Sequence, residues 1–175
     1  MRTQALRLGC ATKPARPALL VWLSLCFVRG MTSQPRVAAD IMSRDLVTLH
    51  ETQNLRFLPE VMKLFRFRHM PVVDGERLVG LVSERDVLRV SASSLLPAAH
   101  EQTDFLSRTF AVRDIMTRDV VSVHPETTLA EVARLMRRDK LGCVPVVEGE
   151  NTLVGIITEA DFVILSVRYL NGELH

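Results

Sequence analysis

Residues 40–48 read Asp-Ile-Met-Ser-Arg-Asp-Leu-Val-Thr, and residues 114–122 repeat them as Asp-Ile-Met-Thr-Arg-Asp-Val-Val-Ser. Two more stretches recur in the same order: Met70–Glu76 returns as Val144–Glu150, and Leu78–Asp86 returns as Leu153–Asp161. One residue is inserted near Thr152, between these two stretches. Nineteen of the 46 aligned pairs are identical. The chain therefore contains a duplicated unit.

Each copy is predicted to fold in the order β-α-β-β-α. A one-turn Asp-Ile-Met helix end precedes the first strand, and a turn, Asp-Gly-Glu or Glu-Gly-Glu, joins the second strand to the third. The predicted strands are Leu46–Leu49, Pro71–Val73 and Leu78–Val82 in the first copy, and Val120–Val123, Pro145–Val147 and Leu153–Ile157 in the second.

The helix starts are predicted from capping patterns. Thr128 and Glu131 fit a capping box at the start of an amphipathic helix in the second copy. The equivalent helix of the first copy contains Pro59, which is tolerated only in a first turn, so this helix is predicted to start near Pro59. The closing helices are predicted to begin at Ser83 and Thr158.

The duplication predicts an α/β (α+β) fold. One unit of about 50 residues has a marginal core on its own. We therefore expect the two β-α-β-β-α repeats to pack sheet to sheet, with pseudo-twofold symmetry. The predicted segments are a leader at 1–30, a first repeat at 36–95, a connector at 96–109 and a second repeat at 110–170.

The charge of the chain is unevenly placed. The 175 residues carry 22 Lys and Arg against 20 Asp and Glu, but five of the basic and none of the acidic side chains lie in residues 1–30. The remaining 145 residues have 17 basic and 20 acidic groups, a net charge of −3. This balance argues against a general nucleic-acid binder, which needs clustered positive charge. A hydrophobic content of 47% also excludes intrinsic disorder.

Residues 1–30 have two main interpretations, beside a mobile tail or another targeting signal. Ala18–Val28 is an eleven-residue apolar run behind a basic stretch, which is too short to cross a bilayer but resembles a secretory signal. The alternative, which we favour, is that translation starts at Met31 and that residues 1–30 are upstream sequence read in frame. Only Cys143 lies in the body of the chain, so no structural disulfide is expected there.

The motif that can carry chemistry is Gly-h-h-[Ser/Thr]-x-x-Asp, in which h is an aliphatic residue. It occurs at Gly80–Asp86 and at Gly155–Asp161. A hydroxyl where a strand turns into a helix lies beside unpaired backbone N–H groups, which suits a phosphate. An Asp one turn later can accept hydrogen bonds from both hydroxyls of a ribose. The same residues also form an ordinary helix cap, but their duplication behind identical hairpins favours the ligand site.

The ordered, duplicated set Asp-Ile-Met-[Ser/Thr], Pro-Val-Val and Gly-h-h-[Ser/Thr]-x-x-Asp resembles a tandem pair of CBS domains, a Bateman module. The resemblance covers residues 36–170 and implies two clefts that bind adenosine-containing ligands: AMP, ADP, ATP or S-adenosylmethionine. It also implies that modules pair. By motif, Asp86 and Asp161 match the ribose-binding Asp, while Ser83 and Thr158 match the hydroxyl near the phosphate.

The resemblance also places the adenine against strand edges. The residues implied there are Thr48 and Ser122 after the first strands, Met70 and Pro71, and Val144 and Pro145. Arg68 and His69 precede Met70 where family members hold basic residues near phosphates, and the second copy has Gly142 and Cys143 instead. We therefore expect the two clefts to differ, with the Arg68/His69 side preferring a multiply charged phosphate tail.

Other candidate sites are weaker. His50 and His124 are equivalent, but no Cys, Asp or Glu at ligand spacing accompanies them, so no metal site is predicted. Cys143 is interpreted as a small buried apolar residue. The basic and aromatic stretch Lys63–His69 is interpreted as a core or partner-facing segment, with Phe65 or Phe67 exposed. The chain has no phosphate-binding Gly-x-x-x-x-Gly-Lys-[Ser/Thr] loop and no nucleophile elbow, so no catalytic residue is predicted.

The function predicted from the resemblance is a stand-alone, non-enzymatic regulatory module. Its ligand is an adenylate, with no obligatory cofactor, and its partners are a second copy and an unidentified effector protein, but neither nucleic acid nor a membrane. A cytoplasmic location is expected because adenylates are abundant inside cells. The alternative is a ligand-free oligomerisation or partner-docking module in which Ser83, Asp86, Thr158 and Asp161 are only helix caps.

Overall fold

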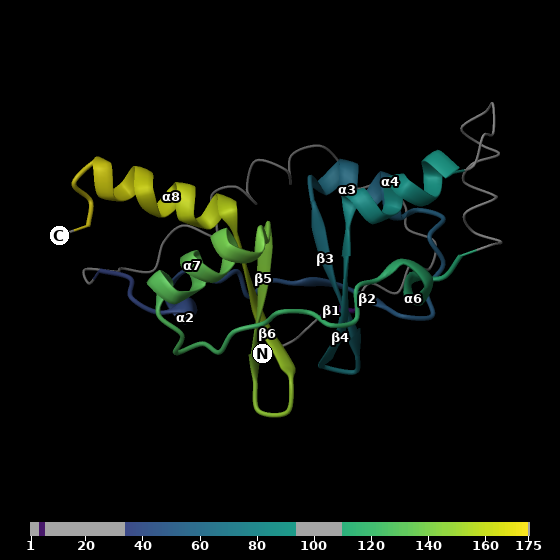
Figure 1. Ribbon diagram of the computed structural model, residues 1–175, viewed down its shortest axis with the longest axis horizontal. Helices are drawn as coiled ribbons and strands as arrows, with labels where there is room; N and C mark the ends of the chain where they lie inside the picture. The colour runs from purple at the N-terminus through teal and green to yellow at the C-terminus, as the bar shows by residue number, and fades with distance from the viewer. Residues whose placement is uncertain (1–3, 6–33, 94–109, 175) are drawn as a thin grey trace.

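The computed structural model describes residues 4–5, 34–93 and 110–174 (Figure 1). The predicted connector 96–109 lies outside the described residues, and so does the predicted leader apart from Gln4 and Ala5. The N-terminal part of the sequence, which holds the first repeat, contains β1 (Gln4–Ala5), α2 (Ala38–Ile41), β2 (Val47–His50), α3 (Leu58–Phe65), β3 (His69–Asp74), β4 (Arg77–Ser83) and α4 (Glu84–Ser93). The C-terminal part, which holds the second repeat, contains α6 (Val112–Ile115), α7 (Leu129–Asp139), β5 (Cys143–Glu148), β6 (Thr152–Thr158) and α8 (Glu159–Leu170).

The strands form one mixed sheet in the order β1-β2-β3-β4-β6-β5. Each repeat contributes an antiparallel hairpin, β3–β4 or β5–β6, and both hairpins carry an irregularity at the same point, Val72/Val73 and Val146/Val147. The two hairpins meet through one pair, Arg77 with Thr152, which are equivalent residues of the two copies. The predicted α/β class and the pseudo-twofold duplication are thus confirmed.

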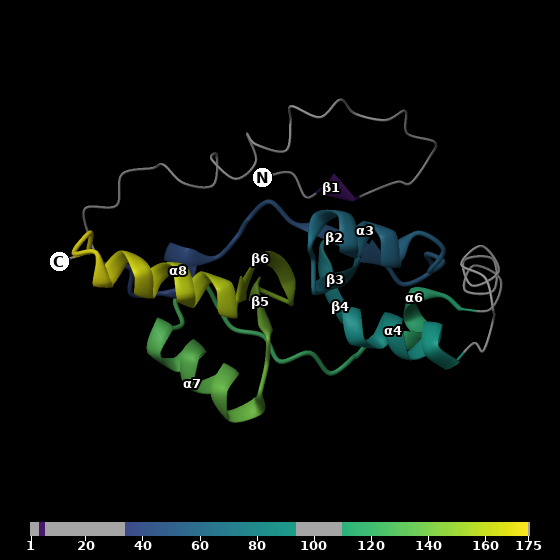
Figure 2. The ribbon, with the colours of Figure 1, turned by 90° about the horizontal axis from the view of Figure 1, so that it is seen from above.

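The one-turn helices α2 and α6 are exchanged between the halves. Figure 1 shows α2 on the side of the molecule that holds α7 and α8 of the second repeat, and α6 on the side that holds α3 and α4 of the first. Figure 2 shows the two connecting segments running in opposite directions between the halves. Ser43 pairs with Ile156 of β6, and Thr117 pairs with Leu81 of β4. Each repeat therefore completes the core of the other, which explains why neither copy needs a full core of its own.

The exchange of α2 and α6 explains why each Gly-h-h-[Ser/Thr] motif begins with a glycine. The Met42 side chain lies so close to Gly155 that a Cβ there would be 2.5 Å from Met42 Sδ. The equivalent Cβ on Gly80 would be 2.6 Å from Met116 Sδ. Both methionines belong to the Asp-Ile-Met segments, so the two motifs that define the repeat contact each other across the halves.

The inserted residue is Asn151, which lies at the junction of the two hairpins. Its backbone has a φ of 78°, in the left-handed region that Asn tolerates better than most residues. The Asn151 side-chain amide donates to the Leu78 carbonyl oxygen at 2.6 Å, and the Asn151 carbonyl accepts from the Leu78 N–H at 2.9 Å. The insertion therefore ties the second hairpin to the first.

The helix starts predicted from Pro59 and from the Thr128/Glu131 pair are confirmed, and the closing helices α4 and α8 begin one residue after the predicted Ser83 and Thr158. Pro59 lies in the first turn of α3, where its missing N–H costs nothing. Thr128 caps α7: its backbone N–H and its hydroxyl both donate to the Glu131 carboxylate. The Glu131 N–H in turn donates to Thr128 Oγ1 at 3.3 Å.

The predicted strand Val120–Val123 is wrong in extent. Only Val123 pairs with β5, through hydrogen bonds with Pro145 and Val147, and Val121 is 40% exposed. In the first copy β2 is longer because it pairs with β1 at Val47 and Thr48 as well as with β3. In the second copy, Val123 pairs with β5. Residues 120–122, which precede it, cross between the halves as irregular chain.

In the part of the chain that the structure describes, the core consists of three groups of buried side chains. One lies in the first half and includes Val112 and Met116 from α6 and its C-cap. Another lies in the second half and includes Ala38 and Met42 from α2 and its C-cap. A small third group joins the two hairpins and contains Val73, Leu78, Val147 and Leu153.

Candidate functional site

A cleft of about 300 Å³ opens between the two halves beside the first Gly-h-h-[Ser/Thr]-x-x-Asp motif. The first repeat contributes the end of β4 and the first two turns of α4, with Ser83 and Asp86 among the lining residues. The second repeat contributes two segments, Thr117–Val121 after α6 and Lys140–Cys143 before β5. The exchange of α2 and α6 brings these segments together, because Thr117 is held against Leu81 by two backbone hydrogen bonds of 2.9 Å.

Ser83 and Asp86 form a hydrogen-bonded unit at the start of α4. The Ser83 hydroxyl donates to Asp86 Oδ2 at 2.5 Å, and the Ser83 N–H donates to the same oxygen at 3.0 Å. The other carboxylate oxygen, Oδ1, lies 3.6 Å from a guanidinium nitrogen of Arg89. The Asp86 side chain is 21% exposed and lines the cleft. Oδ2 thus serves as a helix cap. Oδ1 faces the exposed guanidinium of Arg89, whose place a ligand hydroxyl can take.

Thr158 and Asp161 repeat this geometry at the start of α8. The Thr158 N–H donates to Asp161 Oδ2 at 2.7 Å, and the Thr158 hydroxyl donates to it at 2.8 Å. Both side chains are partly buried. The two copies of the motif therefore have the same local conformation in the two halves of the molecule.

The structure places Arg68 and His69 differently. His69 lines the cleft beside Ser83 and Asp86, and its ring lies against Gly142 of the other half, where a Cβ would be 2.8 Å from His69 Cε1. Arg68 is exposed and lies 3.8 Å from the Glu159 carboxylate, next to Thr158. The expected basic pair is thus divided between the two copies of the motif.

Burial of the His69 ring lowers its pKa from the usual 6.5. The positive charge of Arg68 lowers this pKa further, as does that of Arg85, whereas Glu159 and Asp86 act in the opposite direction. The imidazole is therefore held toward its neutral form at the interface between the halves.

We expect the stability of the protein to fall as the pH drops below about 6.5, because unfolded His69 then binds a proton that the folded ring resists. Melting temperatures measured between about pH 5 and pH 7.5 should fall less steeply toward acid in a His69→Gln variant than in the unmodified protein. The matched control is His50→Gln, at the exposed end of β2. An unchanged slope in His69→Gln would contradict this assignment.

The residues implied as adenine contacts are mostly buried. The side chains of Met70, Pro71, Val144 and Pro145 lie inside the sheet and its cores rather than in the cleft. Ser122 is partly buried in the irregular segment before Val123. The cleft wall nearest to these positions is formed instead by Val120 and Val121, which directly precede Ser122.

Thr48 lies at a separate small cavity between β2 and α3. The cavity measures about 30 Å³, and Met70 and Asn54 also line it. The Thr48 side chain is 2% exposed, and its Oγ1 has no hydrogen-bond partner among the described residues. A space of this size and polarity suits a water molecule.

Sequence reasoning missed several cleft residues. Arg85 occupies one of the variable positions inside the motif, and Arg89 follows Asp86 by one helical turn. Lys140 is the C-cap of α7 in the left-handed conformation, and Asp119 follows α6. The two arginines could have been found from the spacing of three and four residues that places side chains on one helix face. Lys140 and Asp119 reach the cleft only through the tertiary arrangement.

The remaining sequence predictions concern single side chains. Cys143 is buried as predicted, and burial raises the pKa of its thiol to about 12, which makes it inert. Phe65 is exposed and stacks on Phe67 with a centroid distance of 5.7 Å. Within residues 34–93 and 110–174, no three His, Cys, Asp or Glu side chains are grouped as a metal site requires. None of the described helices is both long and apolar enough to span a membrane.

Comparison with protein families gives two matches to the CBS domain, at residues 37–93 and 112–167. Among solved structures, CBSX2 of Arabidopsis thaliana in complex with AMP is 26% identical, with a TM-score of 0.64 over 77% of this chain and 98% of that one. The CBS domain pair of protein MJ0100, in complex with 5-methylthioadenosine and S-adenosyl-L-methionine, is 25% identical, with a TM-score of 0.61 over 78% of this chain and 97% of that one.

Among curated proteins, an inosine-5'-monophosphate dehydrogenase of Korarchaeum cryptofilum is 30% identical over 132 residues. The match covers 75% of this chain but only 25% of the dehydrogenase. The chain thus spans about a quarter of the length of that relative.

Proposed function

Because the chain belongs to the CBS domain family and carries two copies of that domain, we propose that it is a regulatory module that binds an adenosine-containing ligand. The ligand class is AMP, ADP, ATP or S-adenosylmethionine. The observation that carries the proposal is the cleft that both halves build around Ser83 and Asp86. Complexes of similar CBS pairs with AMP and with S-adenosyl-L-methionine support it.

Ligand recognition is proposed to use the two ends of the motif. The N-terminal turn of α4 offers backbone N–H groups and a positive dipole end to a phosphate, beside the Ser83 hydroxyl. Asp86 accepts hydrogen bonds from the ribose hydroxyls through Oδ1, and Arg89 moves away from that oxygen. Val120 and Val121 offer an apolar wall to the adenine. Thr158 and Asp161 are proposed to serve a second ligand in the same way.

The signal is proposed to be a change in the packing of the two halves. A ligand in the cleft contacts Asp86 from one repeat and Thr117–Val121 from the other, so binding favours whichever arrangement of the halves fits the ligand best. Turnover of the ligand is not part of this function, because no catalytic motif occurs in the sequence. A cytoplasmic protein with an effector on another chain fits this role.

A thermal-shift experiment with AMP, ADP, ATP and S-adenosylmethionine tests the proposal. A ligand that binds only the folded state at about 100 times its Kd stabilises it by about 2.7 kcal/mol. The melting temperature should then rise by several degrees. Cytidine monophosphate is the control for the base and should give a smaller shift.

The competing function is a ligand-free docking module. The hydrogen bonds from Ser83 to Asp86 and from Thr158 to Asp161 favour it, because they are those of helix caps. No thermal shift with any of the four adenosine compounds would support this alternative and contradict ligand binding.

We further propose that the module forms a homodimer through its closing helices. No residue of α8 is buried, and Val163, Val167 and Leu170 are 61%, 50% and 81% exposed at a spacing that places them on one face. Leu88 of α4, the equivalent of Val163, is 57% exposed. Two such faces from two copies can cover each other.

The variant Val163→Glu/Val167→Glu should be monomeric in light scattering at concentrations at which the unmodified protein is a dimer, because it places charges in the centre of this apolar face. Tyr169→Glu is the matched control, since Tyr169 is an exposed residue on another side of the same helix. A dimer that persists in the double variant would assign dimerisation to another surface.

A further inference from the structure

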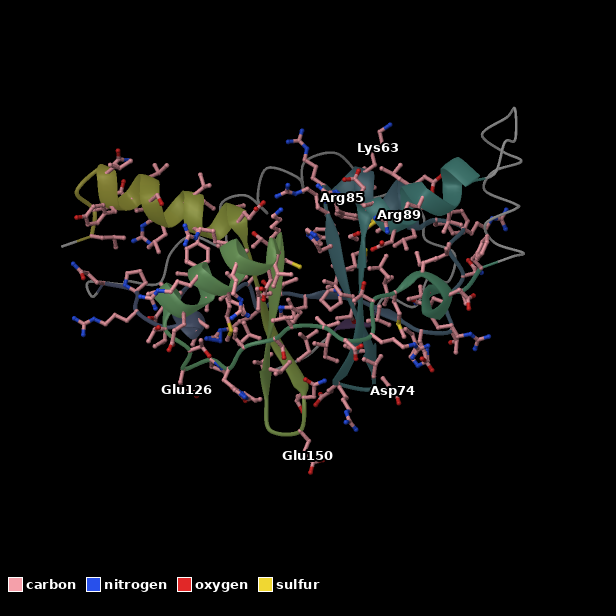
Figure 3. All side chains as sticks on the ribbon, viewed as in Figure 1. Lys63, Asp74, Arg85, Arg89, Glu126 and Glu150 are labelled. Atoms are coloured by element: carbon pink, nitrogen blue, oxygen red, sulfur yellow. The ribbon has the colours of Figure 1, made fainter. Side chains whose placement is uncertain are left out.

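The cations around the Ser83/Asp86 cleft form a group that the repeat motif does not require. Arg85 and Arg89 come from the first two turns of α4, and Lys140 comes from the C-cap of α7 in the other half. All three side chains are exposed at the rim of the cleft, while Ser83 and Asp86 lie deeper. Figure 3 shows Arg85 and Arg89 at the helix end of the molecule, opposite the hairpin-turn acids Asp74 and Glu150.

The second copy of the motif lacks two of these cations. Sequence alignment of the repeats places Ala160 where Arg85 stands and Ile164 where Arg89 stands. The position of Lys140 is taken by Arg66, which has the same left-handed conformation. The two arginines are therefore a property of the first cleft alone.

The acids do not cancel this difference. The first cleft contains Asp86 and Asp119, and their equivalents in the second copy are Asp161 and Asp45. Three cations against two anions leave the first cleft with a formal charge of +1, while Arg66 and Arg68, the latter equivalent to the lining residue Gly142, against two anions leave the equivalent positions at 0.

His69 and Arg68 do not remove the asymmetry. His69 in the first cleft is held toward its neutral form by burial, which lowers its pKa. Arg68, near Thr158, is paired with Glu159 at 3.8 Å. The two copies thus present the same ribose-binding and capping groups, but only the first carries two arginines on its closing helix and a net positive charge at the rim.

We infer that the Ser83/Asp86 cleft selects adenosine di- and triphosphates over the monophosphate, with Arg85, Arg89 and Lys140 holding the terminal phosphates. This inference rests on the proposed adenosine-binding function and names its ligand class at one of the two sites. The cleft of about 300 Å³ accommodates a nucleoside, and a longer phosphate chain extends over the rim, where the three cations lie. Arginine can bind phosphate oxygens in a bidentate manner, which favours it for this role.

Isothermal titration calorimetry with ATP and AMP tests the inference, in an Asp161→Ala background that leaves only the first cleft competent. The quantity measured is the ratio of the two affinities, because Arg89 also contacts Asp86 and its loss can change binding of both nucleotides. Arg85→Ala/Arg89→Ala should lower the ATP affinity by about tenfold and the AMP affinity by less than about threefold. Lys63→Ala, an exposed cation of α3 that does not line the cleft, is the control and should leave the ratio unchanged.

The reciprocal variant supplies an independent test. Ala160→Arg/Ile164→Arg in an Asp86→Ala background should raise the preference of the second site for ATP over AMP. If AMP and ATP bind the first cleft equally and the double alanine variant leaves their ratio unchanged, the inference is overturned while the proposed function stands. If neither nucleotide nor S-adenosylmethionine binds to the unmodified protein, the proposed function itself fails.

Discussion

Gly155→Ala is expected to destabilise the protein by about 1–3 kcal/mol, because the new methyl group overpacks the contact between the repeats. Its Cβ would lie 2.5 Å from Met42 Sδ, 2.9 Å from Cγ and 3.1 Å from Cβ, so the whole Met42 side chain must move. Ser43 is hydrogen-bonded to Ile156 in both directions, at 2.9 and 3.0 Å, which keeps the Met42 backbone in place. Chemical denaturation with urea measures the free energy of unfolding.

The size-compensating variant Gly155→Ala/Met42→Ala is the control for this prediction. It removes the clashing side chain, so its loss of stability should be smaller than the sum of the two single losses by about 1 kcal/mol. Gly80→Ala should behave in the same way with Met116, since its Cβ would lie 2.6 Å from Met116 Sδ and 3.1 Å from the Thr117 carbonyl oxygen. Strictly additive effects would show that the methionines and glycines do not form the contact that joins the halves.

Asp86→Ala is expected to lower the affinity of the first cleft for adenosine ligands by at least about tenfold. It removes a charged acceptor, and each hydrogen bond to such a group contributes about 1.5–3 kcal/mol. Asp161→Ala should have the same effect at the second site. Titration calorimetry of each single variant should therefore lose one class of binding sites, and the double variant should lose both.

The helix-cap role of Asp86 must be separated from its ligand role. The Asp86 carboxylate accepts from the Ser83 N–H and hydroxyl, so Asp86→Ala should also lower the melting temperature without ligand. Glu84→Ala, an exposed carboxylate of the same helical turn, is the matched control and should leave affinity unchanged. A variant that loses stability but keeps its full affinity for every adenosine ligand would establish that Asp86 is only a cap.

The asymmetry between the two sites has a consequence for regulation. A cleft that prefers polyphosphates and a site without the two arginines would respond to different members of the adenylate pool. The exchange of α2 and α6 places residues of both repeats beside each motif, so a ligand bound at one proposed site would change the packing around the other. Coupling of this kind is reciprocal, and each ligand should alter the affinity of the other by the same factor.

The repeat and its local structure follow from the order of amino acids alone. The 74-residue spacing, the Pro-Val-Val strands and the Gly-h-h-[Ser/Thr]-x-x-Asp motif predicted the hairpins and the closing helices. Pro59 and the Thr128/Glu131 pair also predicted where α3 and α7 start. These features depend on dihedral preferences and on contacts within a few residues, which the chain encodes directly.

Which segments face each other depends on the packing of the whole chain. This packing puts Met42 on Gly155, brings Lys140 to a cleft with Arg85, and places Arg68 and His69 beside different copies of the motif. It also leaves Val120–Ser122 as irregular chain where the repeat predicted a strand. Two units of similar sequence can pack with their own short helix or with that of the other copy. The sequence of one unit does not distinguish these two arrangements, because they differ in contacts between residues far apart in the chain.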